Sequence, residues 1–305
     1  MNIIEWLQNG DESISRLTKK YLLGETPTYA YSGWISAYLE LFDEKTNMWS
    51  NAIYSPKWTS TFYTLRELII LEADPNDARM QKAYQTLLKH MWLEHHKING
   101  CGCMIAMLLS MGIYLKQDQK LIDELLKFII DHQIFDGGFN CEVTRREVKS
   151  SSIHTTISTL EALNALTKSK YKYDQVKVNK IIDEAEDFLL RKNLLRRERD
   201  GRLIQSFIKE IHYPTRWKYD YLRALVYFAK KEKPYDSRME EGLTLLKSKF
   251  KRRTLPKGSS YQGLLHFELD NQDVKRMNTL NGLIVLKYYD DKLYQKITGE
   301  VYENI

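Results

Sequence analysis

The chain has 305 residues, of which 43% are hydrophobic and 28% charged, a balance typical of a globular protein with one or two domains. Only six prolines and 14 glycines interrupt it, so we expect a mostly helical chain with short connections. Three cysteines are too few for a disulfide framework, and no apolar run approaches the ~20 residues of a membrane span. The first residues also lack the basic start and long apolar run of a signal peptide, so we expect a cytoplasmic protein.

The formal net charge is +6, and the basic residues gather in two runs, residues 191–202 and 247–253. Lys and Arg are favoured at the C-terminal turns of helices, so solvated helix ends account for both runs. No recognised nucleic-acid motif accompanies the charge. We therefore expect no nucleic-acid partner.

The hydrophobic pattern predicts a series of helices separated by turns. Asn76 or Asp77 is expected to cap the helix that follows Pro75, while Asn99-Gly100 and Asp200-Gly201 mark turns. The predicted helical segments are residues 1–23 (one or two helices), 29–42, 59–71, 78–92, 104–115, 118–133, 153–166, 174–195, 221–230, 236–250 and 277–289.

The clearest unit spans residues 136–166 and contains a turn, a polar loop and a helix. Gly137 and Gly138 allow the chain to reverse, and Ser151 or Ser152 is expected to cap the helix. Weaker versions of this unit recur along the chain: TLREL at 64–68 resembles TLEAL at 159–163. Their offset of 95 residues matches two helix-pair repeats of about 45–50 residues each.

Two kinds of helix alternate in this pattern. Residues 118–133 are strongly amphipathic, whereas residues 104–115 are apolar on nearly every side. An apolar helix must be covered all round, and a one-sided helix on a single face. Both needs are met by a closed double ring, with apolar helices inside and amphipathic helices outside; an open solenoid is the competing arrangement. We therefore predict an all-α protein, a single α/α-toroid domain over residues 1–305.

These units resemble the repeats of the terpenoid-cyclase and protein-prenyltransferase superfamily, and are most similar to uncharacterised bacterial proteins of the prenyltransferase and squalene-oxidase repeat type. The resemblance implies a central cavity for an apolar, possibly isoprenoid, small molecule. The matching residues are His132-Gln133, Asp136-Gly137-Gly138-Phe139, Ser152-Ile153-His154-Thr155-Thr156 and Leu160-Glu161-Ala162-Leu163.

The catalytic motifs of that superfamily are not carried by this chain. It has no Asp-x-Asp-Asp motif of the squalene cyclases; Asp74-Pro75-Asn76-Asp77 is a poor imitation. The zinc ligands of the protein prenyltransferases would fall near Ser152, His154 and Trp217, which do not carry the required side chains. The resemblance therefore implies a fold more strongly than a reaction.

His154 and Asp220 are the candidate acid/base residues. His154 is predicted one or two residues inside an inner helix, where a toroid would point it towards the cavity. Glu142, near the turn at Asp136, is a candidate to orient the imidazole. Alternatively, His154 bonds a neighbouring loop or packs at the rim, Asp136 caps its turn and Glu142 is solvated.

Candidate binding residues lie where two apolar helices are expected to begin. Arg216 is expected to hold an anionic group, with Trp217 and Tyr221 stacking on the ligand. Alternatively, Arg216 and Asp220 pair on the helix surface as i and i+4 residues. Two further aromatic residues, Trp58 and Tyr63, either line an apolar pocket or belong to the core.

Cys101-Gly102-Cys103, with His95-His96 nearby, is the one pattern that suggests zinc. Structural zinc sites usually have Cys-x₂-Cys spacing and four ligands, so buried thiols are favoured and no metal is expected. The sequence indicates no particular cofactor.

The first functional hypothesis is a transferase-like or cyclase-like enzyme acting on an apolar small molecule. The second is a non-catalytic toroid that binds a ligand or peptide in the same cavity. The third is a helical-repeat scaffold with an open groove. Converging ionisable groups with shifted pKa values would favour the enzyme.

Overall fold

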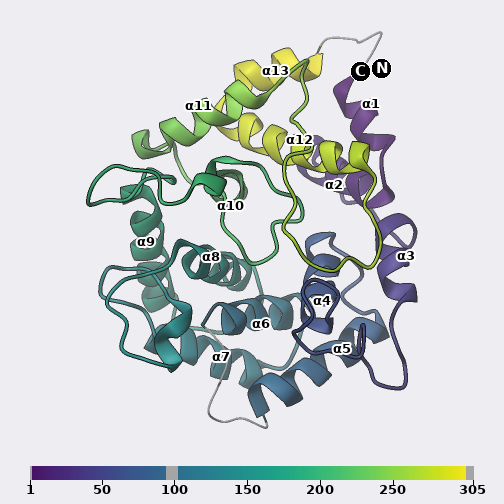
Figure 1. The fold of residues 1–305 in the computed structure, drawn as a ribbon, viewed down its shortest axis with the longest axis vertical. Helices are drawn as coiled ribbons and strands as arrows, with labels where there is room; N and C mark the ends of the chain where they lie inside the picture. Colours follow the sequence, from purple (N-terminus) through teal and green to yellow (C-terminus); the bar gives the residue numbers. More distant parts are fainter. Residues whose placement is uncertain (1, 94–101, 300–305) are drawn as a thin grey trace.

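The computed structural model describes residues 2–93 and 102–299, and within these residues the protein is all-α, as predicted (Figure 1). They form thirteen α-helices and no strand; the extended pairing among them consists of isolated bridges. The helices are α1 (Ile3–Gln8), α2 (Glu12–Leu23), α3 (Gly33–Glu40), α4 (Thr61–Ile70), α5 (Ala78–Leu88), α6 (Gly102–Tyr114), α7 (Gln119–Asp131), α8 (Ile153–Thr167), α9 (Gln175–Arg191), α10 (Tyr221–Lys230), α11 (Glu240–Lys249), α12 (Asn271–Tyr289) and α13 (Asp291–Gly299).

The helices pack as pairs of neighbours in the sequence. Figure 1 shows α4, α6, α8 and α10 towards the middle of the molecule, with α5, α7 and α9 outside them. Each inner helix contacts the outer helix that follows it, from α4 and α5 to α12 and α13. The inner helices also contact one another, α4 with α6, α6 with α8, α10 with α12, and α12 with α2. The first and last helices, α1 and α13, contact each other.

Burial follows the two kinds of helix that the sequence predicts. Ten of the thirteen residues of α6 are buried, against four of the thirteen in α7. The wholly apolar helix is covered on most sides, and the amphipathic helix on one face, because each buries the apolar surface it has. No helix within the described residues is long and apolar enough to cross a membrane.

Aspartates cap three outer helices and the inner helix α10. Asp77, Asp118, Asp174 and Asp220 each accept a hydrogen bond from a backbone N–H in the first turn of α5, α7, α9 and α10. The predicted serine cap of α8 is wrong. Ser152 at the N-cap makes no side-chain cap bond.

The neighbouring serine is engaged elsewhere. The Ser151 hydroxyl donates to the carboxylate of Asp136, which also accepts the Ser151 N–H at 2.9 Å. Asp136 therefore joins the glycine turn to the start of α8, and it removes the second candidate cap from the helix.

Several predicted boundaries differ from the observed ones. The helix predicted over residues 29–42 is only Gly33–Glu40, and α12 begins at Asn271 rather than residue 277, because Asp270 caps it. The final helix α13 was not predicted. The Asn99-Gly100 turn and most of the proposed zinc pattern, His95, His96 and Cys101, lie outside the described residues.

The predicted i and i+4 pair of Arg216 and Asp220 is also wrong. The helix begins only at Tyr221, and Asp220 is its N-cap, so Arg216 lies in the preceding loop with a φ of 54°. Its guanidinium instead faces Glu67 of α4, with Nη1 3.2 Å from Oε1.

Candidate functional site

The inner helices line a cavity of about 350 Å³ that contains several ionisable side chains, here called the central cavity. Helices α2, α4, α6, α8, α10 and α12 all contribute lining residues. Its size is that of a small-molecule site. Its ionisable lining includes Arg66, Glu72, Glu161, His212, Asp220, Arg223 and Lys230.

Arg223 and Glu161 form a bidentate ion pair that links α10 to α8 in this cavity. Arg223 Nε donates to Glu161 Oε1 at 2.7 Å, and Nη2 donates to Oε2 at 2.6 Å. Nη1 donates to the carbonyl of Lys218 at 2.7 Å. Burial would raise the pKa of Glu161, but the Arg223 charge outweighs burial and holds this pKa below its usual value. The carboxylate is therefore ionised.

Arg66 of α4 lies on the other side of the same carboxylate. Its residue is 7% exposed, and its Nη2 is 3.9 Å from Glu161 Oε2. Its Nη1 is buried and makes no hydrogen bond. Burial and then the nearby Arg223 charge lower the pKa of Arg66 to about 10, so the guanidinium stays charged at neutral pH.

His212 and Asp220 form a second polar pair. Asp220 Oδ1 accepts the Arg223 N–H at 2.8 Å, while Oδ2 lies 3.3 Å from His212 Nδ1. Because an ionised carboxylate only accepts, this bond places the imidazole proton on Nδ1. The ring is stacked on Tyr261, with ring centres 4.4 Å apart. The other ring nitrogen, Nε2, then has a free lone pair that can accept a proton, and His212 lines the cavity.

Lys230 lies at the far end of α10 from Arg223, two helical turns along. Its ammonium stands 3.9 Å from the ring centre of Tyr21, and it makes no hydrogen bond or ion pair with a described residue. Burial lowers the pKa of Lys230 to about 8, although the Glu72 carboxylate opposes this shift.

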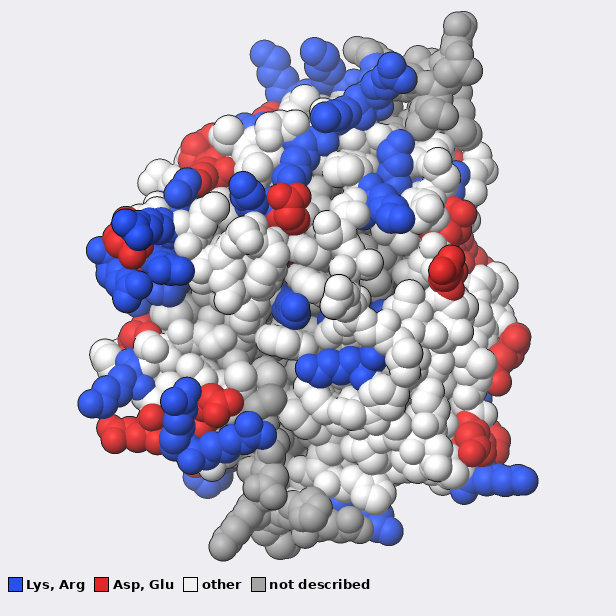
Figure 2. Space-filling view, viewed as in Figure 1, with Lys and Arg blue, Asp and Glu red and all other residues white. Residues whose placement is uncertain are grey.

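A second hollow of about 290 Å³, here called the mouth pocket, lies beneath the strap formed by residues 257–269. In Figure 1 the yellow-green strap lies between α10 and α3. Around it, Figure 2 shows that much of the centre of this face is uncharged, with most Lys and Arg side chains near the edge. The aromatic lining residues are Tyr38, Trp58, Tyr213, Tyr261, His266 and Phe267.

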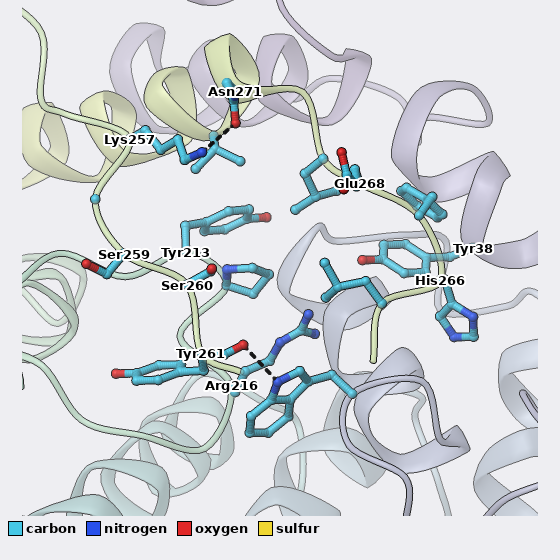
Figure 3. Close-up of a pocket in the computed structure, with 17 residues that line it drawn as sticks. Tyr38, Tyr213, Arg216, Lys257, Ser259, Ser260, Tyr261, His266, Glu268 and Asn271 are labelled. Carbon is cyan, nitrogen blue, oxygen red and sulfur yellow. Dashed lines mark hydrogen bonds between the residues drawn. The ribbon is translucent and has the colours of Figure 1, made fainter. Parts of the chain in front are cut away.

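Trp58 anchors the strap. Its indole Nε1 lies 3.2 Å from the carbonyl oxygen of Tyr261 (Figure 3). The same Nε1 lies 3.0 Å from the carbonyl oxygen of Gln262. Its backbone N–H donates to the carbonyl of Leu264 at 3.0 Å. Arg216 points into the mouth pocket in Figure 3, with its guanidinium carbon 5.4 Å from the Trp58 ring centre.

One ring pair separates the two hollows. Tyr261 lines the mouth pocket, and the stacked His212 lines the central cavity. A ligand that reached from one hollow into the other would pass this pair.

The structure places His154 outside both hollows, beside a surface hollow that also contains Lys192 and Arg197. Its Nδ1 accepts the backbone N–H of Tyr219 at 2.8 Å. Burial, then the charge of Arg223, lowers the pKa of His154 to about 4. The imidazole is therefore neutral at pH 7, and it ties the start of α8 to the loop before α10.

Glu142 lies in a 3₁₀ turn, Cys141–Thr144, where its carboxylate is 3.7 Å from Arg145 Nη1 and 3.9 Å from Arg146 Nε. Its side chain is 35% exposed. These arginines, rather than His154, are its ion-pair partners.

The remaining predicted aromatic residues belong largely to the core. Tyr63 is fully buried and donates from its hydroxyl to that of Tyr54 at 2.8 Å. Tyr221 is also fully buried. Trp217 is half-buried and packs edge-on against His154, with ring centres 5.2 Å apart.

Sequence reasoning brought Asp220, Arg216 and Trp58 to the hollows but missed Arg66, Glu161, Arg223, His212 and Lys230 as site residues. A signal for three of them was present. Arg66, Glu161 and Arg223 are charged residues inside otherwise apolar helices, in TLREL, TLEAL and YLRALVY. A charge on a helix that is buried all round must face a polar space or a partner.

Comparison of the chain with protein-family models, curated proteins and solved structures gave no match. Within residues 2–93 and 102–299, no group of three His, Cys, Asp or Glu side chains is arranged to hold a metal ion. The function is therefore argued from the geometry of the two hollows.

Proposed function

We propose that the chain is a single α/α-toroid domain, similar to the terpenoid cyclases and protein prenyltransferases, with an active site in its central cavity. The contribution of six alternate helices to one cavity supports this arrangement. So does the packing of α5, α7, α9, α11 and α13 against those helices. A scaffold with an open groove is disfavoured, because its concave residues would not converge on one cavity.

The reaction we propose is a proton transfer on a small molecule, with His212 as the general base and Asp220 as the residue that orients it. The single observation that carries this is the bond between Asp220 and His212 Nδ1 in a cavity that contains several ionisable side chains. It leaves Nε2 as the proton acceptor. His212 takes the place of His154, whose Nδ1 lone pair already accepts the Tyr219 N–H, so that its neutral ring has no free lone pair to accept a proton.

The two hollows together favour a substrate with a polar and an apolar part. The reacting polar part would lie in the central cavity beside His212, and an apolar part, such as an isoprenoid chain, in the mouth pocket against Tyr38, Trp58 and Tyr213. Tyr261 would move aside to join the two.

The test compares wild-type protein with His212→Asn in mixtures of small molecules extracted from bacteria. Mass spectrometry would follow which molecules are consumed and which co-purify with the protein. We expect the wild type to consume at least one molecule that His212→Asn binds but does not convert. The control for this His212–Asp220 dyad is an Arg145→Gln variant, because Arg145 is an exposed residue that lines neither hollow. Equal turnover by wild type and His212→Asn would overturn the assignment.

A non-catalytic binding protein is the second candidate, favoured by the aromatic lining of the mouth pocket. In that case a ligand would co-purify unchanged with both proteins, and Trp58→Ala rather than His212→Asn would release it.

A further inference from the structure

Two basic side chains of the central cavity lack a close carboxylate among the residues that the structure describes. The lining carries three carboxylates, Glu72, Glu161 and Asp220, and three basic side chains, Arg66, Arg223 and Lys230. Glu72 is held from outside the lining by Lys20, at 2.6 Å, and by Arg16, at 3.8 Å, and Glu161 is held by Arg223. Arg66 and Lys230 are therefore left without a short ion pair to a described residue.

Arg66 is the cation whose donors are least satisfied. Glu161 is already taken by two short bonds from Arg223, and its approach to Arg66 is only 3.9 Å. No hydrogen bond joins the Arg66 guanidinium to another residue in the described parts of the chain, and Nη1 is buried without a partner. A guanidinium has five N–H donors in a fixed fork, so a buried one without acceptors is unusual.

Further donors line the same cavity. Asn164 is one helical turn beyond Glu161 on α8, and Asn281 lines the same space from α12. Neither side-chain amide is hydrogen-bonded to another described residue, so each has an N–H to offer. Lys230 adds an ammonium without a carboxylate partner.

We propose that the ligand of the central cavity carries an anionic oxygen group, a carboxylate or a phosphate, that binds Arg66. Such a group supplies the acceptors that the guanidinium lacks and pairs with its charge. The Arg223–Glu161 pair borders this binding position next to Arg66. This inference rests on the proposed function, since it names the substrate class of the same cavity.

The experiment measures binding of inorganic phosphate and of succinate by isothermal titration calorimetry, at an ionic strength held constant with sodium chloride. We expect wild-type protein to bind at least one of the two anions, and Arg66→Gln to bind it at least tenfold more weakly. Arg145→Gln is the matched control, because it removes an exposed guanidinium from the protein surface, and it should bind as the wild type does. The anion that binds identifies the group as phosphate or carboxylate.

Circular dichroism would confirm that the variants are folded. If Arg66→Gln does not fold, Arg66→Lys keeps the charge but loses the fork, and the affinity should still fall severalfold. The proposal is overturned if wild-type protein binds neither anion, or if substitution of Arg66 leaves the affinity unchanged.

The two proposals fail separately. If His212→Asn loses turnover but the wild type binds neither anion, only the anion site is contradicted. If the wild type binds an anion but His212→Asn turns over as fast as the wild type, only the acid/base assignment is contradicted.

Discussion

Arg223 of α10 holds Glu161 of α8 through two parallel hydrogen bonds, at 2.7 Å and 2.6 Å, across the central cavity. This pair joins two helices that share few other contacts, whereas the neighbouring pairs α6 with α8 and α10 with α12 pack extensively. A polar link therefore closes the wall of the cavity at a place where apolar packing is thin.

Removing one partner should destabilise the fold. We expect Arg223→Met to lower the free energy of unfolding by about 2–3 kcal/mol, because the Glu161 carboxylate loses both short hydrogen bonds and keeps only Arg66, at 3.9 Å. The loss is smaller than for a fully buried pair, since the Glu161 side chain keeps 34% exposure, in contact with the cavity. Urea denaturation measures the change. Arg145→Met, which breaks the exposed contact with Glu142, should change stability by less than about 0.5 kcal/mol; equal effects of the two substitutions would refute the argument.

His154 should make stability depend on pH. Its pKa is about 4 in the folded protein and about 6.5 when unfolded, so its contribution is complete above pH 6.5 and is lost as the pH falls towards 4. Between pH 7.5 and pH 5 this loss amounts to about 2 kcal/mol. The measurement is urea denaturation at both pH values for wild type and His154→Gln. The variant should lose less stability on acidification, and an identical loss would show that the imidazole is not the group responsible.

The His212 tautomer tests the dyad directly. With Asp220 ionised, nitrogen-15 NMR of labelled protein should show the proton on Nδ1. Asp220→Asn keeps a residue that caps helices well, so α10 should persist, but its amide can donate to Nδ1 and shift the proton to Nε2. We expect the tautomer to change while the helical circular dichroism does not. A wild-type imidazole protonated on Nε2 would contradict the proposed general base.

Two glycines should respond in opposite ways to alanine. A Cβ at Gly263 in the strap would lie 2.4 Å from Trp58 Nε1 and 2.9 Å from the Lys57 carbonyl, so Gly263→Ala should loosen the strap and cost about 1–3 kcal/mol. Gly242 lies inside α11, where a Cβ would meet only ordinary contacts at 3.5 Å or more, so Gly242→Ala should stabilise the protein by about 0.5–1 kcal/mol. Hydrogen–deuterium exchange of residues 257–269 should rise only in Gly263→Ala. A strap that exchanges equally in both variants would mean that Trp58 does not anchor it.

The sequence determined the secondary structure and the burial of most helices, because periodicity and composition are local properties. The apolar run of α6 predicted burial on most sides, and the one-sided pattern of α7 predicted burial on one face, as the structure shows. Helix ends were less well determined: α12 begins six residues before the prediction, where Asp270 acts as the cap.

Only the tertiary structure decided which polar groups meet. One of the two readings of the sequence paired Asp220 with Arg216 four residues away, yet Asp220 bonds to His212, while Arg216 crosses to Glu67 on another helix. For His154 the sequence left a cavity position and a bond to a neighbouring loop open, and a backbone N–H from the loop before α10 holds its ring. A buried charge takes the partner that the packing of helices brings within about 3 Å, and the partners here are up to 149 residues apart in the sequence, a relation that no local pattern records.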